Sequence, residues 1–330
     1  MLAWLDLGLI FGLMARGVYL TFRILDFADL TIDGSFTSGA ATAAVLLVAG
    51  WPPLAATAAA GGVGLLAGMI TGLLNTAGKI HPLLAGILTQ IALYSINLRI
   101  MGKANVPLLR TDTLFTPLRE AGVLGSPVSV ALLTVVLAAF ILLLVWFLST
   151  DVGLALRATG DNEGMARAQG INTDATKLIG LSLSNGLVGL SGALFAQYQG
   201  FADIGMGIGL IVAGLASVII GTATINNGRI WITTIAVVFG SIVYRGIIQA
   251  ALRVSWFDPN DMKLLSALIV VAALLLPRWE VFNRLRVRTR EKQFVVEPWD
   301  TPDPEELDSG DSRPPSQGVT RKVRRKNNNA

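Results

Sequence analysis

Long apolar runs separated by short polar breaks dominate the first 280 residues of the chain. No Asp, Glu, Lys or Arg occurs from Phe36 to Gly78 or from Ala121 to Thr150. A membrane-spanning helix needs about 20 mostly apolar residues, so these runs are long enough to hold several spans. The pattern predicts apolar segments at 2–22, 35–50, 53–75, 82–101, 127–149, 174–197, 204–222, 229–252 and 262–279. We therefore expect an all-α polytopic membrane protein with eight or nine transmembrane helices. The lower number applies if one of the nine segments is re-entrant and does not cross the membrane.

Composition supports this class and excludes several chemistries. Of the 330 residues, 53% are hydrophobic and only 15% are charged, whereas soluble domains are about 25% charged. The chain has no cysteine, which excludes disulfides, thiol catalysis and cysteine metal sites. The only histidine, His81, precedes Pro82 at a predicted helix start and is interpreted as a turn residue. We expect no metal, no cofactor and no nucleic-acid partner, since the net charge is only +4.

Charge asymmetry orients the spans. The stretch 277–292, PRWEVFNRLRVRTREK, carries six Arg or Lys and two Glu directly after the last segment, and positive loops stay in the cytoplasm. Counting back places the loop at 150–173 in the cytoplasm and the loop at 102–126 outside. We expect a transmembrane domain at 1–280, and a basic juxtamembrane segment with a disordered cytoplasmic tail at 281–330, where large apolar residues are almost absent.

Two internal patterns bear on helix packing. The tripeptide FAD occurs at Phe27–Asp29 and again at Phe201–Asp203, after spans that run in opposite directions. This is consistent with an inverted repeat, although a three-residue match is equally compatible with chance. Small residues also recur at every fourth position in two segments, which predicts close approach of helix backbones. They are Ala60, Gly64, Gly68 and Gly72, and Gly209, Ala213, Ser217 and Gly221.

The polar loop contains a predicted short helix over 161–169. Asp161 is a candidate N-cap, Glu163 lies in the first turn, and Gly170 is a stop signal. So short a helix is marginal by itself, so we expect it to pack against something. The helix presents a low-profile apolar surface formed by Met165, Ala166 and Ala168. It has neither the bulky apolar face nor the Lys/Arg-rich polar face of helices that lie on a membrane surface. This favours a protein partner over lipid.

The same region carries a family resemblance. Residues 150–196, TDVGLALRATGDNEGMARAQGINTDATKLIGLSLSNGLVGLSGALFA, resemble the core signature of permease subunits of ABC importers of the branched-chain amino acid and ribose type. Residues 22–44, FRILDFADLTIDGSFTSGAATAA, are similar to a subgroup whose substrate-binding partner is a separate lipoprotein or periplasmic protein. GIGLIVAGLASVIIG at 207–221 fits the same family, and the resemblance covers about 1–280.

The resemblance implies a function and a set of partners. The loop at 150–173 would contain a coupling helix that docks on the ATPase. The partners implied are cytoplasmic ATP-binding subunits, an extracytoplasmic solute-binding protein and a second permease chain, identical or different, all at the inner (plasma) membrane. The solute implied is a small organic compound, an amino acid or a relative of one. The implied coupling residues are Asp161, Asn162, Glu163, Met165, Ala166, Arg167 and Gly170.

ATP hydrolysis is expected on another chain. The stretch GLLNTAGKI at 72–80 resembles a phosphate-binding loop only superficially, because five residues instead of four separate its glycines and Ile80 follows Lys79 where Ser or Thr is needed. An intramembrane enzyme is likewise disfavoured, since no nucleophile or metal set can be assembled. A secondary transporter driven by H⁺ or Na⁺ stays open as an alternative, with Asp29 or Asp203 as its ion-coupling carboxylate.

A solute path needs polar groups at membrane depth. The candidates are Asp29, Asp33, Gln90, Asn97, Asn185, Gln197 and Asp203. Two interpretations of LDFADLTIDGS at 25–35 stay open: a loop whose Asp33 caps the second span, or broken backbone inside the bundle. Asn185 is interpreted as an interhelical hydrogen-bonding residue more readily than as a solute ligand.

Overall fold

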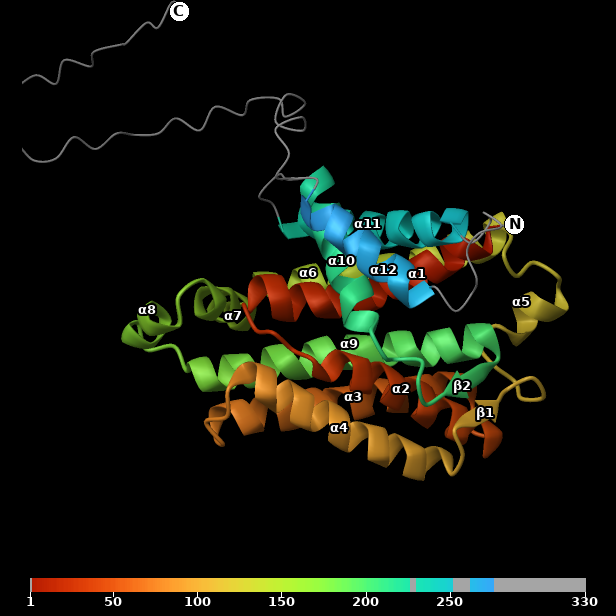
Figure 1. Cartoon of the computed structure of the whole chain (residues 1–330), viewed down its shortest axis with the longest axis horizontal. Coiled ribbons are helices and arrows are strands. Elements are labelled where there is room, and N and C mark those ends of the chain that lie inside the picture. Colours follow the sequence, from red (N-terminus) through yellow and green to blue (C-terminus); the bar gives the residue numbers. More distant parts are fainter. Residues whose placement is uncertain (1, 226–229, 252–261, 276–330) are drawn as a thin grey trace, which may run out of the picture. The chain divides into compact units, whose positions relative to one another are not determined.

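The computed structural model describes residues 2–225, 230–251 and 262–275 (Figure 1). In chain order the elements are α1 (Ala3–Val18) with the π-helical turn η1 (Tyr19–Ile24), α2 (Thr31–Val48), α3 (Pro53–Thr76), α4 (Pro82–Met101), β1 (Asn105–Pro107), α5 (Thr116–Glu120), α6 (Pro127–Ser149), α7 (Asp151–Asp161), α8 (Glu163–Ala168), α9 (Thr173–Gln199), β2 (Phe201–Asp203), α10 (Leu210–Thr224), α11 (Ile230–Ala251) and α12 (Met262–Leu275). The predicted basic segment and tail at 281–330 lie outside the described residues.

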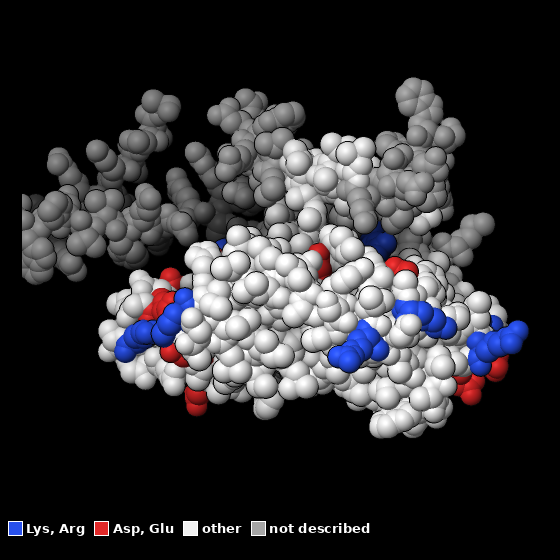
Figure 2. Space-filling model, turned by 60° about the horizontal axis from the view of Figure 1, so that its bottom comes forward, with Lys and Arg blue, Asp and Glu red and all other residues white. Residues whose placement is uncertain are grey.

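The all-α polytopic prediction is confirmed. In the described part of the chain, 7 helical segments are long and apolar enough to cross a membrane, with α1 and η1 forming one of them, and α10 is a shorter apolar helix. The seventh apolar segment was predicted to begin at residue 204, and this start was wrong. Asp203 still belongs to β2, and the helix begins at Leu210 after Gly209, whose φ of +85° interrupts the chain there. On the face shown in Figure 2, a broad area between charged clusters is free of Lys, Arg, Asp and Glu, as contact with lipid requires.

Helix α9 is the central helix of the bundle, and it packs most extensively on α3 and α2. The predicted small-residue face of α3 makes this possible. A Cβ at Gly64 would overlap the carbonyl of Asn185, and one at Gly68 would overlap the carbonyl of Leu181. Backbone thus lies directly on backbone, which is the usual solution where lipid removes the hydrophobic drive for helix association.

The packing is consistent with an inverted repeat of α1–α4 and α9–α12. Helix α9 packs on α2 and α3, and correspondingly α1 packs on α10 and α11. Helices α1 and α9, the first helices of the two halves, run antiparallel. Ser184 Oγ donates to Gly17 O at 2.7 Å, and seven residues later along α9 Ser191 Oγ donates to Ile10 O at 2.8 Å, which lies earlier in α1. The two FAD tripeptides also share a local turn. Asp29 accepts the N–H of Thr31 at 2.9 Å, and Asp203 accepts the N–H of Gly205 at 2.9 Å.

Two buried charged residues of α1 hold α6 against the bundle. Asp6 accepts hydrogen bonds from Ser129 Oγ of α6 at 2.5 Å and from the Tyr198 hydroxyl of α9 at 3.2 Å. Arg16, which is fully buried, donates from Nη1 to the carbonyl of Leu137 at 3.1 Å. These bonds offset part of the cost of burying charge in an apolar medium, while Asp6 Oδ1 and Arg16 Nε and Nη2 have no partner among the described residues.

At the opposite end of the bundle from α7 and α8, β1 and β2 form an antiparallel pair in which Val106 lies opposite Ala202 (Figure 1). The pair joins the segment after α4 to the segment after α9. Since α4 is the last helix of the first half and α9 is the first helix of the second, this short ladder ties the two halves together at that end.

Candidate functional site

The polar loop folds into a helical hairpin of α7 and α8 with two side-chain caps. Thr150 Oγ1 accepts the N–H of Gly153 at 3.3 Å, and Asn162 Oδ1 accepts the N–H of Met165 at 3.0 Å. The predicted N-cap was therefore wrong by one residue: Asp161 is the last residue of α7, and Asn162 caps α8. Asn is as good a cap as Asp, so the sequence did not separate the two. The predicted stop at Gly170 is confirmed, with φ at +85°.

Ion pairs fasten α8 to the start of α9. Glu163 Oε1 lies 2.7 Å from Lys177 Nζ, and Arg167 Nη2 lies 3.1 Å from Glu163 Oε1 and 2.8 Å from Asp174 Oδ1. The hydrogen bond from Lys177, with the positive charges of Lys177 and Arg167, holds the pKa of Glu163 below its usual value. Most of these charges are partly exposed, so each pair contributes little stability by itself. Together they fix the orientation of a helix too short to be stable alone.

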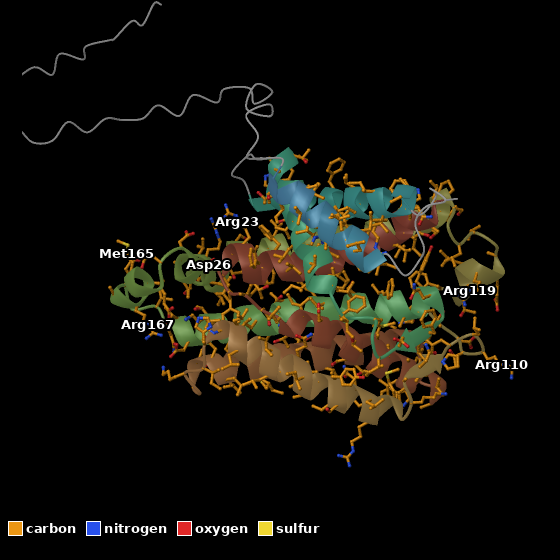
Figure 3. The ribbon with its side chains drawn as sticks, in the orientation of Figure 1. Arg23, Asp26, Arg110, Arg119, Met165 and Arg167 are labelled. Carbon is orange, nitrogen blue, oxygen red and sulfur yellow. The ribbon has the colours of Figure 1, made fainter. Side chains whose placement is uncertain are left out.

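The seven candidate coupling residues do not share one surface. Met165 is 62% exposed and lies at the outer tip of the hairpin (Figure 3), and Ala168 is also exposed. Ala166 is only 3% exposed and packs inward, so its predicted place on the outward apolar surface was wrong. Glu163 and Arg167 are engaged with α9, while Asp161, Asn162 and Gly170 are exposed. The surface free to contact another protein therefore centres on Met165.

Three of the seven candidate path residues line one pocket. Its volume is about 390 Å³, and it lies between α2, α4 and the segment after β2. Its lining residues are Asp33, Gly34, Thr37, Gln90, Ile91, Tyr94, Ser95, Asn97, Ile204 and Ile208. Tyr94 and Ser95 were not among the sequence candidates. The signal for Tyr94 was present, because Gln90, Tyr94 and Asn97 recur at i, i+4 and i+7, which is one face of a helix.

Asp33 has a defined role at the wall of this pocket. Its carboxylate accepts the N–H of Gly209 at 2.8 Å and that of Ile211 at 2.8 Å, so it caps α10 from the neighbouring helix α2. The interpretation in which Asp33 caps the second span, α2, was therefore wrong: Asp33 is a cap, but of α10. A carboxylate is well placed here, because the free N–H groups and the dipole of a helix N-terminus both favour negative charge.

Asp29 and Asn185 bond to each other inside the bundle. Asn185 Nδ2 donates to Asp29 Oδ2 at 2.6 Å, and Ser35 Oγ donates to Asn185 Oδ1 at 2.7 Å. Asp29 is only 1% exposed, and Asn185 lies near the middle of α9, so the segment 25–35 enters the bundle at Asp29, while Asp26 and Ala28 stay exposed. Of the two open interpretations, broken backbone inside the bundle is the one that the structure supports. The interpretation of Asn185 as an interhelical hydrogen-bonding residue is also supported.

The last two candidates lie at the end of the bundle that carries β1 and β2. Gln197 Nε2 donates to Thr57 Oγ1 at 2.8 Å, and its Oε1 accepts the N–H of Leu114 at 3.0 Å. Asp203 Oδ2 accepts from Asn105 Nδ2 at 3.4 Å. Gln197 is fully buried and Asp203 half-buried, and neither lines the pocket. Their hydrogen bonds give them a structural role in joining separate segments.

Comparison with known proteins places the chain in a family. Residues 1–274 match the family model described as the permease component of branched-chain amino acid transport systems. A tyrosine transport system permease protein of Clostridioides difficile (strain R20291) is 43% identical over 267 residues, which cover 81% of this chain and 88% of that protein. No solved structure matches the chain.

Two more distant relatives widen the range of transported compounds. The galactofuranose transporter permease protein YtfT of Escherichia coli (strain K12) is 26% identical over 268 residues, covering 80% of this chain and 76% of the relative. The ribose import permease protein RbsC of Haemophilus influenzae is 24% identical over 219 residues, covering 64% and 65%. With its multi-span α-helical bundle, the chain belongs to the family of permease components of branched-chain amino acid transport systems, the membrane subunits of ABC transporters.

Proposed function

We propose that the chain is the membrane-spanning permease subunit of an ABC importer for an amino acid or a closely related solute. It works with a second permease chain, two cytoplasmic ATP-binding subunits and an extracytoplasmic solute-binding protein. The tyrosine transport permease that is 43% identical supports an amino acid as the solute and makes tyrosine the first compound to test. In this proposal α7 and α8 face the cytoplasm, as does the C-terminus, and β1 and β2 face outward.

The observation that carries the proposal is the α7–α8 hairpin with its exposed tip. Met165 is 62% exposed beyond a helix that is fixed to α9 by two ion pairs, from Arg167 to Asp174 and from Glu163 to Lys177. Helix α9 in turn packs along α1, α2 and α3, and α2 forms one wall of the pocket. A push on the hairpin therefore reaches the pocket through helices in backbone contact. This is the geometry that a separate ATP-driven motor needs.

The mechanism follows from differential affinity. ATP binding closes the motor subunits, the hairpins move with them, and the bundle exchanges between outward-open and inward-open states. The loaded binding protein shifts this exchange only because it binds one state more tightly than the other. Asp33 links the two halves of the chain at the pocket wall, since it joins α2 to the start of α10.

Met165→Glu tests the coupling surface. The change places a charge at the outer tip without touching the ion pairs beneath, so the bundle stays folded while the apolar contact with the motor is lost. We expect co-purification of the ATP-binding subunits to fail and stimulated ATP hydrolysis to fall about tenfold or more, as for a residue central to an interface. The matched control is Leu109→Glu, a 77% exposed residue between β1 and α5 on the opposite side of the bundle, which should retain co-purification of the ATP-binding subunits.

The proposal is contradicted where Met165→Glu keeps full association and stimulated hydrolysis. A second measurement separates it from an ion-coupled secondary transporter. Uptake of tyrosine into proteoliposomes should need ATP, the motor subunits and the binding protein together. Uptake by the permease chain alone under an H⁺ or Na⁺ gradient would instead support the secondary transporter.

A further inference from the structure

We propose that the pocket between α2 and α4 binds the ammonium group of the transported solute, with the side-chain oxygen of Asn97 as its acceptor. The inference rests on the proposed function, because it takes the pocket to be part of the solute path. It adds which group of the solute is recognised and where: the primary ammonium group, selected at this pocket by the permease itself rather than by the external binding protein alone.

Asn97 provides the first argument. The residue is fully buried, and its Oδ1 has no hydrogen-bond partner among the described residues. Its Nδ2 donates to the carbonyl of Gly34, but at 3.4 Å this bond is weak. The amide is therefore held loosely, and the torsion next to it is broad, so the amide can turn to present its oxygen to the pocket. A buried acceptor without a partner is costly, and a ligand that donates a hydrogen bond removes that cost.

The charges of the pocket provide the second argument. Among the described residues that line the pocket, Asp33 is the one ionisable side chain apart from the Tyr94 phenol, and none is Lys or Arg. The N–H groups at the start of α10 hold the Asp33 carboxylate in place, and carboxylate oxygens have lone pairs to spare for a further donor. An ammonium group is attracted here, and a carboxylate group is not.

The free polar side chains of α4 complete the site. The Gln90 side chain makes no hydrogen bond within the described part of the chain, and Tyr94 is 49% exposed, with a ring that can lie against a cation. Neighbouring positions of α4 such as Leu88 and Leu98 are apolar and exposed, as lipid contact requires. A polar stripe on such a helix is costly against lipid, which supports a water-filled path at this face. The volume of about 390 Å³ suits an amino acid.

The chain lacks cysteine, which allows a direct test. Ser95→Cys places a single thiol at the pocket of the full-length chain, assembled with its motor subunits in lipid nanodiscs without the binding protein. The rate at which a maleimide labels this thiol is measured with three probes: L-phenylalanine, phenethylamine, which lacks the carboxylate, and 3-phenylpropionate, which lacks the ammonium. We expect L-phenylalanine and phenethylamine to slow labelling and 3-phenylpropionate to leave it unchanged.

Asn97→Leu in the same background should raise the concentration of L-phenylalanine that gives half protection by about tenfold or more, as expected for a lost hydrogen bond to a charged group. The matched control is Thr89→Val, because Thr89 is 3% exposed on the same helix, donates only to Ala85 O at 3.0 Å, and does not line the pocket. Its half-protection concentration should not change.

Equal protection by all three probes, protection by 3-phenylpropionate alone, or no protection by any of them overturns the inference. The probe series requires no change at Asn97, so it decides the preference even where Asn97→Leu fails to assemble. The proposed function is decided separately by uptake. ATP-dependent uptake without an ammonium preference in the labelling leaves the importer standing and removes this site.

Discussion

The α7–α8 hairpin and the α2–α4 pocket use polar side chains in opposite ways. In the hairpin, Glu163, Arg167 and Lys177 satisfy one another at an exposed surface. In the pocket, Asn97 is buried and its oxygen is left without a partner among the described residues. A polar cluster whose groups pair with one another holds a helix in place, whereas an acceptor that is left unpaired is free to bind a ligand, as we propose for Asn97. The comparison predicts that changes at the hairpin alter coupling and that changes at the pocket alter solute binding.

The largest expected effect comes from breaking the backbone contact between α3 and α9, which is the most extensive helix contact of the bundle. Gly68→Val places side-chain atoms on the carbonyl of Leu181, so helix packing is lost at a cost of about 3 kcal/mol or more. We expect little monodisperse protein from the membrane fraction, measured by size-exclusion chromatography. At Gly62 a Cβ meets nothing within 4 Å, so Gly62→Val on the same helix should purify normally. Equal loss in both variants would show that the close approach is not what matters.

An intermediate effect is expected at Asp33. Asp33→Asn keeps one acceptor but removes the charge that complements the start of α10, which should lower stability by about 1 kcal/mol. Thermal unfolding and amide hydrogen exchange at the first turn of α10 measure this. Thr37→Val is the control, because Thr37 lines the same pocket but donates only to the Asp33 backbone carbonyl at 3.1 Å. The capping role is refuted where the control destabilises α10 as much as Asp33→Asn does.

The smallest effect is expected from pH at the hairpin. Because the pKa of Glu163 is lower in the folded chain than in the unfolded one, its ion pairs contribute stability above the ordinary Glu pKa of about 4.3. That contribution is lost as the pH falls through the lower, folded value. Hydrogen-exchange protection of α8 should therefore stay level from neutral pH to about pH 5 and fall below it, by less than about 1 kcal/mol.

Glu163→Gln provides the matched control for this pH dependence. Its α8 amides should be less protected at neutral pH and should lose the acid-dependent step. An unchanged step in the variant would assign the transition to another carboxylate, with Asp174 the nearest candidate because it pairs with Arg167 at 2.8 Å.

Much of the architecture was predictable from local pattern. Apolar runs of about 20 residues lie in helices, and the stop at Gly170 needed only a residue that tolerates positive φ. Errors arose where neighbouring residues were chemically equivalent. Asp161 and Asn162 both suit an N-cap, and Ala166 and Ala168 are the same residue type on different faces of a helix that is too short to show a period.

The sequence by itself determined that the chain crosses the membrane several times and carries a polar loop, because hydrophobicity and charge act residue by residue along the chain. Only the tertiary structure decided which polar groups meet. Asp33 reaches the start of α10, 176 residues away, and Asp29 reaches Asn185, 156 residues away. These partners depend on where helices cross, and the crossings depend on backbone contact at glycines such as Gly64 and Gly68. For the same reason, the unpartnered oxygen of Asn97 becomes visible only once the bundle is assembled.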